Sequence, residues 1–236
     1  MKFLITVFLT VMTLNAVIFG SANGDASRES RLQQKEMQEL FRKSVSDANG
    51  VIKRGEYARA EEYRSGMKLA LQRLESLSLP DEEKQLLVAN MQTHTKLVEA
   101  ITANLQKEAP DLNSAYRGVI GGLDHFNKKL SGIGLSELLQ EWRALSRIKN
   151  LFVKKPSPEL ERAFEEKWTS VVVTITELYL DDEMEEPLFA YLDHYKAYFE
   201  QLSSAYKQAG YANVIKVKPL GYEIKLQLEL LVPRPS

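Results

Sequence analysis

The sequence predicts an all-α fold, mainly an up-and-down bundle of about seven helices, which ends in a small β-hairpin. Apolar residues recur at helical spacing through nearly every window from Glu29 to Ala209. Glycine and proline divide this region into segments of roughly 18 to 27 residues, the length of bundle helices. Short connections favour antiparallel packing of sequence neighbours. A helical-hairpin solenoid is the alternative arrangement.

The first 22 residues predict a secretory signal peptide that is removed from the mature protein. A lysine precedes an apolar run, and small residues follow the run, which is the pattern that signal peptidase recognises. The small residues favour a cut between Ala22 and Asn23, with a cut after Ala26 as the alternative. An uncleaved membrane anchor is a second alternative, because the apolar run approaches the length of a bilayer span.

Composition narrows the compartment and the partners. The chain contains no cysteine and no Asn-X-Ser/Thr sequon, which favours the bacterial periplasm or secretion by a bacterium over a eukaryotic secretory route. If the N-terminal segment is retained, the alternative location is the inner membrane, facing the periplasm. The formal net charge is −1 at pH 7 with both signs interspersed, so no nucleic-acid partner is expected.

The helical bundle domain is predicted over 27–210. Its first two helices cover about 29–52 and 56–77, and Gly55 separates them. The third helix begins at Pro80 and Asp81, and the fourth begins after Pro110 and Asp111. Each of these two carries a strict apolar stripe with alternating spacings of four and three, which indicates helices that pack along their lengths. The stripes are Leu87, Met91, His94, Val98, Ile101 and Leu105, then Leu112, Tyr116, Val119, Leu123, Phe126 and Leu130.

The remaining three helices have clear boundaries. The fifth covers about 135–152, and the sixth begins at Ser157, a good N-cap followed by proline at the first helical position. The seventh covers about 185–209 and ends at Gly210. Within the fourth helix, three glycines at 118, 121 and 122 each cost about 1 kcal/mol relative to alanine, which indicates a local reason for them. We expect close helix packing or a break near Gly121, and the alternative is close approach of the backbone to a ligand or a bend that gates a cavity.

The C-terminal segment predicts a β-hairpin over 214–231. Residues 214–218 and 222–230 alternate apolar and polar side chains, and a Pro-Leu-Gly turn separates them. An isolated two-stranded hairpin is marginally stable in water, so we expect it to pack on the bundle. Pairing with another chain is the alternative.

Catalytic and metal motifs are absent from the sequence. The chain has no nucleophile elbow, no phosphate-binding loop and no His-Glu-X-X-His. None of its three histidines follows a glutamate by three residues, as the Glu-X-X-His pairs of di-iron bundles require. We therefore expect no metal and no cofactor.

Three features are candidate ligand or partner surfaces. The seventh helix carries a stripe of tyrosines, whose flat rings and hydroxyls suit a pocket or an interface as well as a bundle core. His94 is a stripe position that could bind a ligand or respond to pH, or be a hydrogen-bonded core residue. Arg143 and Arg147 lie one turn apart and could hold an anion, or face solvent. The tyrosines of the stripe are Tyr191, Tyr195, Tyr198 and Tyr206.

The sequence predicts an exported, non-enzymatic binding protein that recognises a protein partner or a small ligand, as a sensor accessory, adaptor or inhibitor. The first alternative is an enzyme without a recognisable motif that uses His94, Tyr195 and Arg143. The second alternative is a structural or oligomerisation module that uses the C-terminal hairpin. The missing motifs favour binding over catalysis.

Overall fold

The computed structural model describes residues 24–77, 79–133 and 136–231, and within them it contains helices and no strand. The all-α prediction is confirmed for this part of the chain. The predicted signal peptide, residues 1–22, lies outside the described residues. No described helix is both long enough and apolar enough to span a bilayer. The helices are α2 (Gly24–Arg54), α3 (Arg59–Ser76), α4 (Asp81–Glu108), α5 (Leu112–Ile133), α6 (Ser136–Lys154), α7 (Pro158–Thr176), α8 (Asp182–Ala209) and α9 (Tyr211–Leu230).

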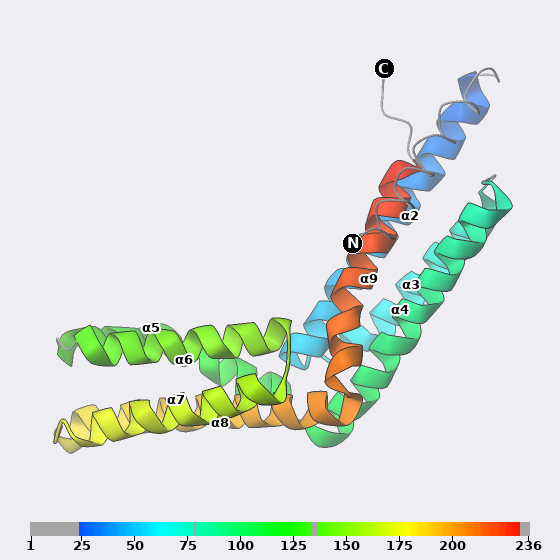
Figure 1. Ribbon diagram of the computed structural model, residues 1–236. Coiled ribbons are helices and arrows are strands. Elements are labelled where there is room, and N and C mark those ends of the chain that lie inside the picture. Colours follow the sequence, from blue (N-terminus) through cyan, green and yellow to red (C-terminus); the bar gives the residue numbers. More distant parts are fainter. Residues whose placement is uncertain (1–23, 78, 134–135, 232–236) are drawn as a thin grey trace.

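The helices form two arms that diverge from a shared elbow (Figure 1). The first arm consists of α2, α3, α4 and α9, and the second consists of α5, α6, α7 and α8. The chain passes between the arms at the α4–α5 and α8–α9 connections. Because α9 returns to the first arm, the C-terminal segment closes a bundle that the N-terminal helices begin.

In the first arm, the apolar stripe of α4 forms the centre of the core. All six of its predicted positions are buried, including His94 at 1% exposure. Helices α2 and α3 pack closely because Gly66 of α3 faces Ser44 of α2, and a Cβ at that glycine would lie 2.4 Å from the serine hydroxyl. The spacing of the sequence therefore predicts this core correctly.

In the second arm, α5 packs mainly on α8 and α6 packs mainly on α7. Gly122 explains the close approach of α5 and α8, because a Cβ there would lie 2.5 Å from a ring carbon of Tyr191. The Tyr191 hydroxyl donates to the Val119 carbonyl at 3.0 Å, on the same stretch of α5. Gly121, by contrast, has nothing within 4 Å of the position where a Cβ would stand. Helices α5 and α6 contact each other much less than either contacts its partner.

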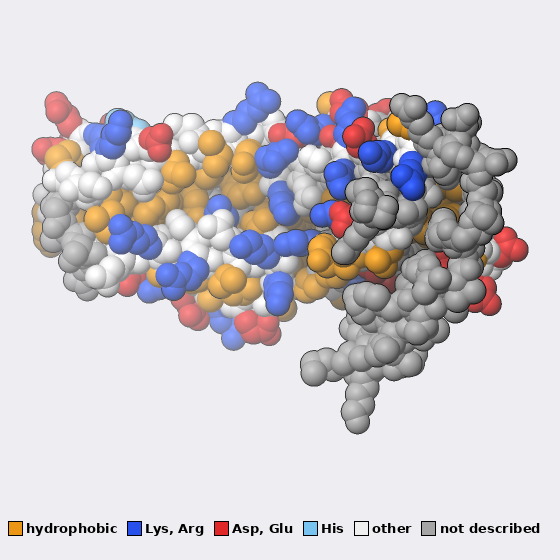
Figure 2. Space-filling view, turned by 90° about the horizontal axis from the view of Figure 1, so that it is seen from above, with side chains coloured by type: hydrophobic (Ala, Val, Ile, Leu, Met, Phe, Trp, Pro, Cys, Tyr) orange, Lys and Arg blue, Asp and Glu red, His pale blue; other side chains and the backbone are white. Residues whose placement is uncertain are grey.

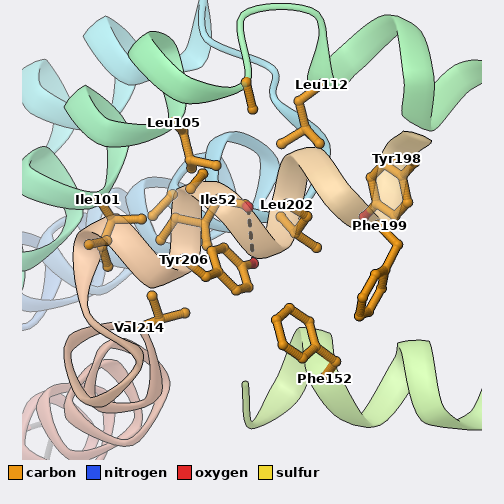
Figure 3. Close-up of a cluster of buried hydrophobic side chains, with 14 of the residues drawn as sticks. Ile52, Ile101, Leu105, Leu112, Phe152, Tyr198, Phe199, Leu202, Tyr206 and Val214 are labelled. Atoms are coloured by element: carbon orange, nitrogen blue, oxygen red, sulfur yellow. Dashed lines mark hydrogen bonds between the residues drawn. The ribbon is translucent and has the colours of Figure 1, made fainter. Parts of the chain in front are cut away.

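The elbow is fixed by side chains of the second arm that bind the end of α2. The final carbonyls of a helix lack partners within the helix and need others when buried. Three of these carbonyls accept hydrogen bonds from α8 and α5, and Figure 3 shows the bond to Ile52. The bonds run from Tyr206 to Ile52 at 3.1 Å, from Tyr198 to Lys53 at 2.8 Å and from Asn113 to Arg54 at 2.8 Å.

An apolar cluster surrounds these bonds and draws on both arms (Figure 3). Ile101 and Leu105 come from α4, Phe152 from α6 and Val214 from the beginning of α9. Phe152 and Tyr206 stack with ring centroids 6.0 Å apart. The elbow is thus a packed and hydrogen-bonded joint between the arms.

The prediction of a C-terminal β-hairpin is wrong, because residues 211–230 form helix α9. Its buried residues, Val214, Gly221, Ile224 and Leu228, follow helical spacing along one face. A glycine occupies one position of that stripe, so the apolar repeat is hidden in the sequence. Tyr222, the first residue of the apparent alternation over 222–230, is 59% exposed.

Gly221 gives α9 its close contact with the first arm. A Cβ at this position would lie 3.1 Å from Nε2 of His94, so a glycine leaves room for the imidazole. The Gln38 amide of α2 donates to the Leu228 carbonyl at 2.7 Å, and Asn90 of α4 binds the Gln227 side chain at 3.2 Å. Packing against α2 and α4 therefore determines the conformation of this segment, overriding its weak local pattern.

Candidate functional site

The weak contact between α5 and α6 leaves a groove along the second arm. Its cavity has a volume of about 600 Å³, within the range of ~300–1,000 Å³ that small-molecule sites occupy. Figure 2 looks down on this arm and shows apolar side chains along the middle of the face, with lysine and arginine beside them. The charged residues of the lining are all cations, and all of them come from α6. The lining residues are Leu123, Asn127, Ser131, Leu139, Trp142, Arg143, Ser146, Arg147, Asn150, Leu151 and Lys154.

One row of α6 side chains makes the groove cationic. Arg143, Arg147, Asn150 and Lys154 follow spacings of four, three and four, so they lie on one helix face. The row extends about 16 Å along the helix at ~1.5 Å per residue. Among the described residues, none of its three cations makes an ion pair, and no carboxylate lines the cavity. The lining of the groove therefore carries a net positive charge.

An aromatic cluster forms the floor of the groove. Trp142 lies 4.6 Å from Phe126, 5.8 Å from Tyr191 and 4.9 Å from Tyr195, measured between ring centroids. Its indole nitrogen donates to the Asn127 side chain at 3.1 Å, which joins the α5 and α6 walls at this point. The floor of the groove is therefore mainly aromatic.

Below the floor lie Tyr195 and Lys149, neither of which lines the cavity. The Tyr195 side chain is 2% exposed. Its hydroxyl lies beside the side chain of Ser146, which lines the groove. Lys149 stands over the Tyr195 ring, with Nζ 5.5 Å from the centroid. Burial lowers the pKa of Lys149, and no described carboxylate pairs with it.

Burial raises the pKa of Tyr195 and keeps its hydroxyl protonated, so this group is a hydrogen-bond donor at neutral pH.

The structure divides the predicted site residues between three places. Arg143 and Arg147 line the groove, and Tyr191 and Tyr195 lie beneath it. Tyr198 and Tyr206 lie in the elbow, where their hydroxyls bind the end of α2. The first two tyrosines of the stripe therefore lie beneath the groove, and the last two lie in the joint between the arms.

His94 lies in the core of the first arm, apart from the groove. Its Nδ1 forms a hydrogen bond of 2.9 Å with the Tyr63 hydroxyl, and the Phe41 ring meets it edge-on. Burial lowers the pKa of His94 to about 4, so the ring is neutral at pH 7. The three residues that an enzymatic site would combine, His94, Tyr195 and Arg143, are thus shared between two arms.

Sequence reasoning missed Trp142, Ser146, Lys149 and Lys154. The spacing that groups Arg143 with Arg147 continues to Lys154, and this signal was present in the sequence. The sequence contains no signal for the separation of α5 from α6, because this separation depends on how α5 packs against α8 and how α6 packs against α7. Only the assembled arm shows that the cationic row borders a cavity.

The described residues contain no group of three or more potential metal ligands. Comparison with protein-family models, with curated proteins and with solved structures finds no match for this chain.

Proposed function

We propose that this chain is an exported, non-enzymatic binding protein whose groove between α5 and α6 takes up an anionic ligand. The observation that carries the proposal is the lining of the groove: Arg143, Arg147 and Lys154 project from one α6 row, unpaired within the described residues, and no acid lines the cavity. Unpaired cations beside an apolar floor attract a ligand that has both an anionic and an apolar part. The N-terminal sequence and the absence of cysteine support the periplasm as the place of action.

The binding part of the proposal can be tested with 8-anilinonaphthalene-1-sulfonate, an anionic aromatic dye that fluoresces in apolar sites. We expect saturable binding that weakens as salt is added, because salt screens the cations. A triple variant with Arg143→Gln, Arg147→Gln and Lys154→Gln should lose most of this binding.

The matched control replaces three exposed lysines of the first arm, Lys43→Gln, Lys68→Gln and Lys96→Gln, and thus removes the same charge from the protein. This control should bind the dye as the unmodified protein does. Equal binding by the groove triple and the control triple would refute the site, provided that urea unfolding shows both to be folded.

The export part requires a separate measurement. The protein is expressed with its own N-terminus, the periplasmic fraction is collected, and its mass is determined. We expect a mature mass that begins at Asn23 or, for the alternative cut, at Ser27. Protein found only in the cytoplasm with an intact N-terminus would contradict export.

A further inference from the structure

A second cationic cluster lies at the elbow, where lysines of both arms come together. We propose that Lys53 of α2, Lys154 of α6 and Lys218 of α9 bind a phosphate group, carried by a soluble molecule or by a lipid head. This site lies beyond the groove between α5 and α6, with which it shares only Lys154. Because α2 and α9 belong to the first arm and α6 to the second, a bound phosphate would connect the two arms.

The core of the elbow brings the ends of α2 and α6 together (Figure 3). Tyr206 of α8 joins them, because its hydroxyl donates to the Ile52 carbonyl at 3.1 Å and its ring stacks on Phe152 with centroids 6.0 Å apart. Lys53 directly follows Ile52, and Lys154 lies two residues after Phe152. Both lysines are therefore in the last turn of their helices, at the edge of one core.

Helix α9 adds the third lysine. It begins at Tyr211, whose ring meets Phe152 edge-on with centroids 6.0 Å apart, and Val214 lies in the same cluster (Figure 3). Lys218 follows Val214 by four residues, and residues at this spacing lie on the same side of a helix. Lys218 therefore stands one turn from the elbow core, on the side of α9 that carries Val214.

The three lysines carry like charges that the fold leaves unbalanced. Burial lowers the pKa of the half-buried Lys53, and neighbouring positive charges lower it further. These charges belong to Lys218, Arg54 and Lys154. Arg54 has a carboxylate partner, Glu56 at 2.8 Å, whereas the three lysines form no ion pair among the described residues. Figure 2 shows lysine and arginine side chains gathered where the second arm meets the first.

The ends of the helices balance only part of this charge. A helix C-terminus carries about half a negative charge, so the ends of α2 and α6 together supply about one. The α2 end also spends its carbonyls on the second arm, because those of Ile52, Lys53 and Arg54 accept hydrogen bonds from α8 and α5. Against the three lysines, about two positive charges remain for a ligand.

A phosphate group matches the cluster in charge and in acceptors. A phosphate monoester carries about −1.5 to −2 charges at pH 7 and presents three strong acceptor oxygens, one for each ammonium group. A carboxylate has a single charge and two oxygens, so it would leave one lysine without its own oxygen. The cluster therefore favours phosphate over a carboxylate, because charge-assisted hydrogen bonds are the stronger ones.

The experiment measures binding of inorganic phosphate to the mature protein by phosphorus NMR, at about pH 8, where phosphate is mainly a dianion. We expect saturable binding of one phosphate per chain. Acetate at the same ionic strength should compete at least about tenfold more weakly than phosphate, because it lacks the second charge and the third oxygen.

Variants locate the site. Lys53→Met and Lys218→Met should each weaken phosphate binding about tenfold, because each removes one charge-assisted hydrogen bond. Both should keep or raise stability to urea, because they relieve the repulsion and methionine retains the apolar part of the side chain. The matched control is Lys216→Met, which removes the same charge from the opposite side of α9 and should leave binding unchanged. Arg143→Gln combined with Arg147→Gln should also leave it unchanged.

Vesicles distinguish the two sources of the phosphate group. The protein is sedimented with phosphatidylcholine vesicles that contain or lack phosphatidic acid, whose head is a phosphate monoester. Retention by phosphatidic acid that Lys53→Met and Lys218→Met abolish assigns the group to a lipid head. Phosphate binding at the elbow without such retention assigns it to a soluble molecule.

The outcomes separate this site from the groove. If Lys53→Met and Lys218→Met bind phosphate as tightly as Lys216→Met does, or if acetate competes as well as phosphate, the inference is wrong. If only the Arg143 and Arg147 double variant loses phosphate binding, the anion binds in the groove, so the elbow site is refuted and the proposed function stands. If phosphate binds at the elbow but the dye does not bind in the groove, the elbow site stands and the proposed function fails.

Discussion

His94 should make the protein less stable in mild acid. The imidazole is 1% exposed, and burial lowers its pKa from an ordinary 6.5 to about 4. The unfolded chain therefore binds a proton at pH 5 that the folded chain excludes, so stability falls as the pH drops through this window. The contribution is complete above pH 6.5 and is lost progressively toward pH 4.

The magnitude follows from the pKa difference. At about 1.4 kcal/mol for each pKa unit, lowering the pKa from 6.5 to about 4 corresponds to a limiting loss of about 3 kcal/mol at low pH. Between pH 7 and pH 5 the expected loss is about 2 kcal/mol, because most of the unfolded histidines are protonated by pH 5. This loss is large beside the ~5–15 kcal/mol by which domains are stable.

The assay is urea unfolding at pH 7 and pH 5, followed by circular dichroism. The loss of unfolding free energy between the two pH values is compared between the unmodified protein and His94→Gln, so that any constant cost of the substitution cancels. His125→Gln, at an exposed position, is the matched control. The reasoning is refuted if His94→Gln loses as much stability on acidification as the unmodified protein does.

Three further substitutions test the packing of the second arm and the elbow, each by urea unfolding. Gly122→Ala should destabilise the protein, because the new Cβ would lie 2.5 Å from the Tyr191 ring. Gly121→Ala, its neighbour in open space, should instead raise stability by about 0.5–1 kcal/mol, and a loss there would contradict the assignment of the two glycines. Tyr206→Phe should cost about 1–3 kcal/mol, because it leaves the buried Ile52 carbonyl without its 3.1 Å partner; an unchanged free energy of unfolding would show that this hydroxyl does not hold the elbow.

Much of the helical architecture could be predicted because the chain repeats its core positions regularly. The α4 stripe through Leu87 and His94 is buried as its spacing predicts, and Ser157 caps α7 by accepting from the Leu160 amide at 3.3 Å. Signals of this kind depend only on residues that are close together in the sequence, so a single sequence is enough to find them.

The C-terminal helix and the groove could not be predicted in the same way. Gly221 is a core position because His94 needs the space, and a glycine gives no apolar signal. Arg143 and Arg147 look like residues of an ordinary solvated face until α5 is seen to stand away from α6. In both places the local structure depends on contacts between segments that are distant in the sequence. The residue pattern within one segment is therefore not enough to predict it.

The most direct test of the groove uses the fluorescence of Trp142, which forms its floor. The chain has two tryptophans, so Trp168→Phe leaves Trp142 as the single reporter. Titration with an anionic amphiphile that carries bromine on its apolar part should quench this fluorescence in a saturable manner, and the unbrominated compound should compete the quenching away. An unquenched Trp142 in the folded protein would contradict the claim that this groove binds an anionic amphiphile.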